Sequence, residues 1–125
     1  MTVERWADAW TRAWNTGDVS ALEDVYAAGC VHRSHPFRDP ESSPLDYARR
    51  ALADEEDIEA RFGEPVVDGD RAAVEWWATL LEEGREITLA GCSILRFDCE
   101  GRCIEQLDYW AQADGRHPAF PGWGR

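Results

Sequence analysis

The order of the secondary-structure signals predicts an α+β fold, with helices first and an antiparallel sheet after them. Apolar residues in the first half recur at helical spacing, whereas the second half contains strand-like stretches. Three glycine-containing turns, at residues 68–70, at residues 82–84 and around Gly101, separate these stretches. Such turns join neighbouring strands antiparallel. The helices must then cover one face of the sheet.

We expect three helices in the first half. The first has an apolar stripe and stops near Gly17, a residue suited to ending a helix. Asp18 or Ser20 can cap a second helix, and Ser43 followed by Pro44 is typical of the start of a third. The buried faces are expected to be Val3, Trp6, Ala7, Trp10 and Trp14, then Leu22, Val25 and Tyr26, and then Tyr47, Ala48, Ala51 and Leu52.

After a short extended piece at residues 30–35, four strands are expected at residues 58–67, 71–81, 86–97 and 103–111. Gly91, in the longest strand, is expected to mark a bend or bulge that curves the sheet. The even positions of the stretch 71–81 are uniformly apolar, which predicts that Trp76 faces inward. Trp77 then faces outward, where a dimer interface would cover it. The tail, residues 115–125, is expected to fold across a pocket mouth or against a dimer partner.

Composition argues against several classes of function. The 125 residues suit a single domain, residues 1–125. A net charge of −12 argues against nucleic acid and an anionic membrane surface. No apolar run approaches the roughly 20 residues of a membrane span, and no secretory signal is visible, so a cytoplasmic location is expected. All 13 basic residues are arginine, which excludes Schiff-base chemistry by a lysine.

Asp108 is unusual for the stretch that contains it. It lies between Leu107 and Tyr109 in a predicted strand, although aspartate is a poor strand residue and is costly to bury without a partner. One face of that strand has residues 104, 106, 108 and 110, and the other has residues 103, 105, 107 and 109. Periodicity alone does not choose between these faces.

Several motifs follow one another between about Thr2 and Ala111. They are Trp10-x-x-x-Trp14-Asn15-Thr16-Gly17-Asp18, Glu75-Trp76-Trp77, Gly84-x-x-x-Thr88-Leu89-x-Gly91 and Glu105-x-x-Asp108-Tyr109-Trp110. In order and spacing they resemble the nuclear transport factor 2-like superfamily, in its SnoaL-like and ketosteroid isomerase-like branch. The resemblance implies a cone-shaped fold, in which a curved sheet wraps around helices and encloses a pocket. It also implies a homodimer. It does not imply one activity, because the relatives include isomerases, cyclases, dehydratases, epoxide hydrolases and binding domains.

The resemblance also implies candidate catalytic residues. SnoaL-like cyclases look to have an acidic residue in the part of the last strand that matches Asp108, which favours an inward carboxylate. His35-Pro36 falls about where ketosteroid isomerases carry the Asp-Pro of their general base, with Ser34 as the alternative. Asp108 and His35 are therefore the predicted catalytic pair. A purely structural carboxylate remains an alternative for Asp108, and for His32 an ordinary strand-edge role is preferred.

Two departures from the isomerase pattern make ketosteroid isomerisation doubtful. Trp10 and Ser93 stand where the isomerases have a tyrosine and a second aspartate, and neither is a strong acidic donor. The other residues that we expect to contact a ligand are aromatic and suit flat, apolar molecules. The predicted ligand-binding residues are Trp10, Trp14, Tyr47, Trp76, Ser93 and Trp110.

Three functions stay open at this point. The first is a cofactor-independent isomerase, cyclase or lyase that acts on a small apolar or polycyclic molecule. The second is a protein that binds such a molecule without transforming it. The third is a dimeric assembly domain whose pocket is residual. No metal is expected, because His32 and His35 have no clear third ligand and the four cysteines lack the usual spacing.

Overall fold

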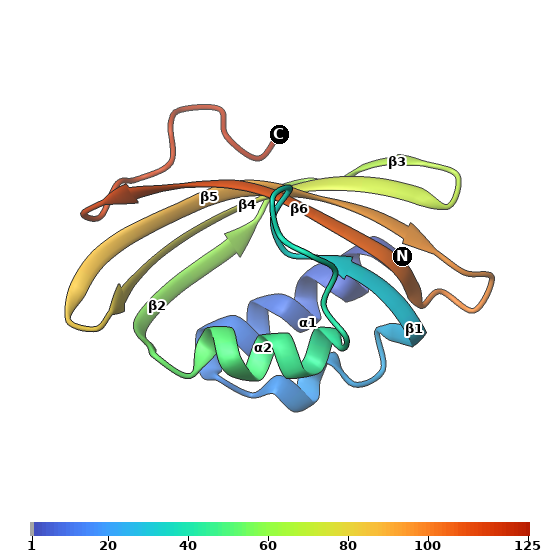
Figure 1. Cartoon of the computed structure of the whole chain (residues 1–125). Coiled ribbons are helices and arrows are strands. Elements are labelled where there is room, and N and C mark those ends of the chain that lie inside the picture. Colours follow the sequence, from blue (N-terminus) through green and yellow to red (C-terminus); the bar gives the residue numbers. More distant parts are fainter. Residues whose placement is uncertain (1) are drawn as a thin grey trace.

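The computed structural model describes residues 2–125, and in this range it contains two α-helices, one 3₁₀ helix and six strands (Figure 1). The helices are α1 (Thr2–Thr16), the 3₁₀ helix η1 (Val19–Leu22) and α2 (Pro44–Leu52). The strands are β1 (Tyr26–Arg33), β2 (Glu55–Phe62), β3 (Val66–Asp68), β4 (Arg71–Glu82), β5 (Arg85–Phe97) and β6 (Cys103–Asp114). The α+β class is therefore confirmed. No helix of the described chain is long and apolar enough to cross a membrane.

The strands form one curved, unclosed sheet in the order β1-β6-β5-β4-β2, and β3 also pairs with β4. Both α-helices lie under the concave face of this sheet, in a cone-like arrangement (Figure 1). The β2, β3, β4, β5 and β6 pairings are antiparallel, but β1 pairs with β6 in parallel. The antiparallel meander predicted for the second half is confirmed. The sheet as a whole is mixed, because β1 adds a parallel edge beside the last strand, which the sequence did not predict.

The expectation of three α-helices is also wrong. Residues 19–22 form a single 3₁₀ turn, whose first residues are capped by the Asp18 carboxylate. Tyr26 was expected to face inward from a longer helix, but it already begins β1 and pairs with Cys103 of β6. α2 begins as predicted, because the Ser43 hydroxyl accepts a hydrogen bond from the Asp46 amide at 3.3 Å.

Gly91 serves close packing between strands and does not form a bulge. The register of β5 with both neighbours is continuous through this position, and the shift between β5 and β6 lies at Arg96 and Phe97. A Cβ atom on residue 91 would lie 2.4 Å from the carbonyl oxygen of Tyr109 and 2.6 Å from the Cβ of Trp110. Glycine therefore allows β6 to approach β5 closely, just beyond Asp108.

The C-terminal tail covers the outer face of the sheet, away from the helices (Figure 1). The indole N–H of Trp77 donates a hydrogen bond to the carbonyl oxygen of His117 at 2.8 Å. The rings of Phe120 and Trp123 pack edge-on against Trp77, with centroids 6.2 and 6.1 Å away. Trp77 does face outward as predicted, but the tail lies on it and does not cross the cavity.

The inner face is apolar along β4, as the alternation predicts. Trp76, Ala78 and Leu80 are buried in one cluster with Trp14 of α1. A second cluster lies between the N-terminal part of α1 and the β1 side of the sheet, around Trp6 and Trp10. The predicted strand 58–67 is divided into β2 and β3 at residues 63–65, where Pro65 cannot donate to the ladder.

Candidate acid–base and ligand site

A cavity of about 440 Å³ lies between the helices and the inner face of the sheet. Its wall contains all six predicted ligand-binding residues, namely Trp10, Trp14, Tyr47, Trp76, Ser93 and Trp110. Asp108 also lines it, together with three glutamates and two arginines. The wall is therefore largely aromatic, with charged groups at a few places, as is common in sites for small molecules.

β6 directs Asp108 into this cavity from the middle of the sheet. Asp108 lies directly opposite Ser93 of β5, and 8% of its surface is exposed. The neighbouring Tyr109 points to the outer face and is 48% exposed. The inward orientation, which the alternation could not choose and the resemblance favoured, is the one observed.

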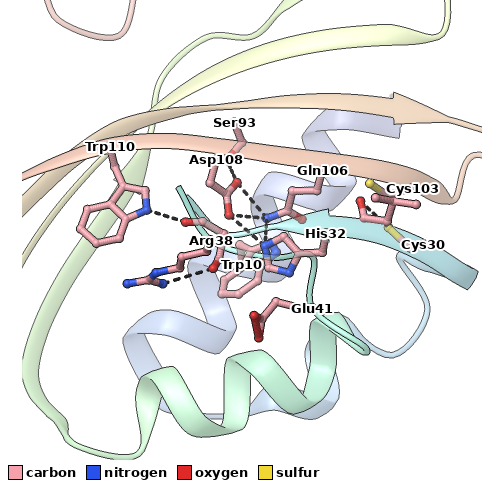
Figure 2. Close-up of polar contacts among 12 residues, drawn as sticks. Trp10, Cys30, His32, Arg38, Glu41, Ser93, Cys103, Gln106, Asp108 and Trp110 are labelled. Atoms are coloured by element: carbon pink, nitrogen blue, oxygen red, sulfur yellow. Dashed lines mark hydrogen bonds and ion pairs between the residues drawn. The ribbon is translucent and has the colours of Figure 1, made fainter. Parts of the chain in front are cut away.

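Three side chains hydrogen-bond the Asp108 carboxylate (Figure 2). The Ser93 hydroxyl donates to Oδ1 at 2.6 Å. The Gln106 amide nitrogen lies 3.1 Å from Oδ1 and 3.2 Å from Oδ2. The Nε2 atom of His32 is 2.9 Å from Oδ2. An ionised carboxylate can only accept hydrogen bonds, so this set of donors stabilises Asp108 in its charged form.

The direction of the Gln106 amide follows from the groups behind it. The Tyr26 hydroxyl accepts hydrogen bonds from the indoles of Trp10 at 2.8 Å and Trp6 at 3.2 Å. Its own hydrogen therefore points to Oε1 of Gln106. With Oε1 used in this way, the amide nitrogen of Gln106 faces Asp108. The chain of donors begins at indoles, which can only donate, and ends at the carboxylate.

A second and shorter chain of donors has the same polarity. The indole N–H of Trp76 donates to the hydroxyl oxygen of Ser93 at 3.0 Å. Ser93 in turn donates to Asp108. Both chains of donors end at the Asp108 carboxylate. Trp10, Ser93 and Trp76 thus hydrogen-bond within the wall, and their contact with a ligand stays a prediction.

His32 fits the network as the neutral tautomer with its hydrogen on Nε2. The side chain is fully buried, and its Nδ1 atom has no hydrogen-bond partner within residues 2–125. A protonated ring would bury an unpaired N–H donor at Nδ1, whereas the neutral ring buries only an unpaired acceptor. The edge of the ring packs against Tyr47, with centroids 4.9 Å apart.

The partner of Asp108 is therefore His32, and the expected pairing with His35 is wrong. β1 ends at Arg33, so His35 lies in the following turn. Its ring packs against Trp110 with centroids 5.0 Å apart, and its Nδ1 accepts a hydrogen bond from the Phe37 amide at 3.3 Å. His35 is not part of the cavity wall.

Strand alternation in the structure explains why His32, and not His35, faces inward. Cys30, His32 and Ser34 are all buried, whereas Val31 between them is 46% exposed. The strand parity therefore turns His32 inward and would turn residue 35 outward. The match to the isomerase Asp-Pro drew attention to His35 instead, and an alignment by motif gives no information on strand parity.

Glu55 is a second carboxyl group of the cavity that the sequence did not reveal. It begins β2 and lies directly opposite Glu82 of β4, another residue of the wall. The indole of Trp14 donates to its Oε1 at 2.8 Å. Burial raises the pKa of Glu55 to about 7, with the Trp14 hydrogen bond opposing and the Glu82 charge adding to the rise. In the sequence Glu55 is one of four consecutive acidic residues, 54–57, and such a run usually indicates solvent exposure.

Trp110 and Arg38, which line the cavity near Asp108, contact each other and the loop after β1. The Trp110 indole donates to the Ser34 carbonyl oxygen at 2.6 Å, and the guanidinium of Arg38 lies over the Trp110 ring at 5.3 Å (Figure 2). Burial raises the pKa of Tyr47, the Asp108 charge raises it further, and Arg38 lowers it. Tyr47 therefore stays a neutral hydroxyl near Asp108.

No arrangement of His, Cys, Asp and Glu side chains in the described part of the chain could hold a metal ion. The four cysteines are free thiols.

The fold and the cavity define a cone-like α+β protein of the nuclear transport factor 2-like superfamily. The chain belongs to the SnoaL-like domain family, whose sequence model matches residues 3–106. This confirms the resemblance inferred from the motifs. No curated protein matches the chain.

Solved structures of similar fold include enzymes. An epoxide hydrolase/cyclase-like enzyme, SalBIII, with a role in pyran ring formation in the polyether salinomycin, has 16% identity and a TM-score of 0.75 over 90% of this chain and 95% of its own. An LEH-like epoxide hydrolase of Mycobacterium tuberculosis has 15% identity and a TM-score of 0.71, over 88% and 82%. A hypothetical protein of Catenulispora acidiphila DSM 44928 with a ketosteroid isomerase-like fold has 18% identity and a TM-score of 0.68, over 83% of both chains. At such identities the likeness concerns the fold.

Proposed function

We propose that this protein binds a small, largely apolar molecule in the cavity and transfers a proton on it, as a cofactor-independent isomerase, cyclase or lyase. Asp108 is the acid–base group, and His32 is a positioning residue behind it. The observation that carries the proposal is a carboxylate on the wall of an aromatic cavity, held there by three side-chain donors. SnoaL-like relatives with enzymatic activity support this class of reaction as an analogy of fold.

In this proposal Asp108 acts first as a base. The C–H or O–H bond of the ligand breaks, the proton moves to a carboxylate oxygen, and the electron pair stays on the ligand as an enolate or alkoxide. Asp108 then gives a proton to a different atom of the ligand or to a leaving group, and this is either the proton that it took or one that its carboxyl group has exchanged with solvent. Ser93, Gln106 and His32 hold the plane of the carboxylate throughout.

Tyr47 and Arg38 are the groups best suited to stabilise negative charge that develops on the ligand. Both line the cavity, and the raised pKa of Tyr47 keeps its hydroxyl as a donor. Trp10 and Ser93, which occupy the isomerase positions, already donate to Tyr26 and Asp108. The isomerase pattern of donors is therefore replaced here by groups from α2 and the preceding loop.

The proposal predicts catalysed exchange of an acidic C–H hydrogen with solvent. The bicyclic ketone 2-tetralone, incubated in D₂O and followed by proton NMR, should lose its α-hydrogens faster with the wild-type protein than without it. Asp108→Asn should slow the catalysed exchange by about 10²–10⁴-fold, because a positioned acid–base group contributes that much. Asp114→Asn, which makes the same change at the exposed end of the same strand, is the matched control and should leave the rate unchanged.

A non-catalytic binding protein is the second candidate, and the saturation of Asp108 favours it. Three donors already engage its two oxygens, which leaves little capacity for a ligand proton. Under this alternative, 2-tetralone quenches tryptophan fluorescence saturably and equally in wild type and Asp108→Asn, and no exchange is accelerated. That result would contradict proton transfer while retaining the ligand cavity.

The homodimer also stays a proposal, as does the cytoplasmic location. We propose that the dimer forms through the part of the outer sheet face that the tail leaves open, where Tyr109 is 48% exposed. Sedimentation velocity should then give a dimer for the wild type and a monomer for Tyr109→Glu. A wild-type monomer at high concentration would contradict this proposal without affecting the cavity.

A further inference from the structure

We propose that Glu55 makes the cavity selective for ligands with a positively charged group, such as a substituted ammonium, next to their apolar part. The inference rests on the proposed ligand-binding role of the cavity and names the chemical class of the ligand. Asp108 and Glu55 then act on different parts of one molecule.

The position of Glu55 is fixed, but its carboxylate is poorly satisfied. The side chain belongs to the cavity wall, and Trp14 is its single side-chain hydrogen-bond donor in the described chain. Asp108, on the same wall, has three such donors. Glu55 therefore retains acceptor capacity toward the interior of the cavity.

No basic side chain neutralises this part of the wall. Glu82 faces Glu55 across the β2–β4 ladder, and like charges in this position repel. Within residues 2–125, no arginine forms an ion pair with either glutamate. The two arginines of the wall are engaged elsewhere, Arg50 with Glu41 and Arg38 with Ser34 and the Trp110 ring.

The other groups that face Glu55 do not supply a charge. α1 contributes the indole of Trp14, and α2 contributes the hydroxyl of Tyr47, whose pKa is raised by burial and, among other causes, by Glu55. β5 contributes the apolar Ile87 and Leu89 to the same wall. The excess of negative charge beside Glu55 is thus a property of the folded protein, and a ligand cation would neutralise it.

The neighbouring rings suit a cation as well. The Trp14 and Trp76 rings meet edge-on with centroids 5.4 Å apart, and both line the cavity. The faces of indole rings attract ammonium groups, most strongly where water is excluded. Aromatic rings combined with a carboxylate favour a quaternary or tertiary ammonium over a neutral group of the same shape.

The raised pKa of Glu55 makes the selectivity for a cation depend on pH. Burial and Glu82 hold the pKa of Glu55 at about 7, so a bound cation, which favours the ionised carboxylate, must release a proton below that pH. Affinity for a permanently charged ligand should therefore rise as the pH rises through about 7. Affinity for a neutral ligand of equal shape should not rise with it.

Phenyltrimethylammonium and its neutral isostere tert-butylbenzene are suitable probes, since neither titrates. We would measure their affinities by tryptophan fluorescence at about pH 6 and about pH 8. At the higher pH the cation should bind the wild type about tenfold or more tighter than the isostere. That preference should fall several-fold at the lower pH. Glu55→Gln should reduce the preference to the part that the aromatic rings supply and should remove its pH dependence, and Glu82→Gln should weaken the preference.

The matched control is Glu56→Gln, which removes the same charge from the next residue, an exposed position outside the cavity wall. It should leave the preference intact. An equal preference in wild type and Glu55→Gln would overturn the inference. So would saturable binding of tert-butylbenzene without any preference for the cation, although that outcome would retain the proposed ligand cavity. Absence of binding by either probe and by 2-tetralone would overturn both proposals.

Discussion

Asp108 and Glu55 line the same cavity, but their surroundings differ in kind. Asp108 lies in the middle of the sheet, and three side-chain donors hold its two oxygens. Glu55 lies at the start of an edge strand, where it receives one indole hydrogen bond and faces another carboxylate. Both are largely withdrawn from water. The two carboxyl groups therefore differ in the donors and charges around them, and only for Glu55 does burial with a neighbouring carboxylate raise the pKa, to about 7.

The difference follows from the sheet register. Asp108 pairs with Ser93, and Ser93 pairs with Val74, so this row crosses three central strands. Glu55 pairs with Glu82, which pairs with Arg85 at the turn between β4 and β5. The three side chains that donate to Asp108 come from β5, β6 and the adjacent β1. The row at the turn has few such neighbours, and Arg85 is engaged with Asp114.

The largest contrast is expected in stability. Asp108→Ala removes the common acceptor of Ser93, Gln106 and His32 and leaves buried donors unpaired, which should lower the free energy of unfolding by about 2–4 kcal/mol. Glu55→Ala removes a carboxyl group that its surroundings penalise, and should change it by less than about 1 kcal/mol. Urea denaturation at neutral pH measures both. Equal losses in the two variants would contradict the contrast.

A smaller effect is expected in the pH dependence of stability. The pKa of Glu55 is raised from 4.5 to about 7 on folding, so its contribution to stability is fully present below about pH 4.5 and is lost as the pH rises through about 7. Relative to Glu55→Gln, the wild type should therefore lose about 1–2 kcal/mol over this window. Thermal unfolding at several pH values measures the difference.

A control for this pH series is again Glu56→Gln, which should track the wild type. If the free energies of unfolding of wild type and Glu55→Gln differed by the same amount at every pH, the pKa of Glu55 would not be raised by folding. The contrast with Asp108 would then rest on hydrogen bonding alone.

The smallest effects are expected from the two indole donors. Trp76→Phe removes the N–H that orients Ser93 toward Asp108, and should cost about 1 kcal/mol. Trp14→Phe removes the hydrogen bond that opposes the rise in the pKa of Glu55. It should cost less and shift the titration of Glu55 upward, as followed by carboxyl carbon NMR. A downward shift would contradict the assigned role of Trp14.

The sequence predicted most secondary-structure elements, but it predicted fewer of the contacts between their side chains. The Ser43 cap, the inward Trp76 and the outward Trp77 followed from local rules, and the structure confirms them. The orientation of Asp108 needed the family resemblance, because alternation on β6 allows either face. Local signals could not separate a 3₁₀ turn from a helix at residues 19–22, since β1 begins only a few residues later.

Contacts between distant parts of the chain account for the rest. His32 becomes the partner of Asp108 because β1 pairs in parallel with β6. No turn connects these two strands, so the sequence contains no local signal for their pairing. Glu55 looks like one of four solvent-exposed acidic residues until α1 places Trp14 beside it. The tail packs Phe120 and Trp123 against Trp77 on the outer face of the sheet, a position that differs from both of those expected for it.

The most direct test of the account asks whether the two carboxyl groups have separate roles. We would measure 2-tetralone hydrogen exchange and phenyltrimethylammonium affinity on Asp108→Asn and Glu55→Gln, at about pH 8. The account predicts that Asp108→Asn loses the exchange and keeps the affinity, whereas Glu55→Gln loses most of the affinity and keeps the exchange. If either variant lost both to the same degree, or if neither lost either, the division of roles between Asp108 and Glu55 would be wrong.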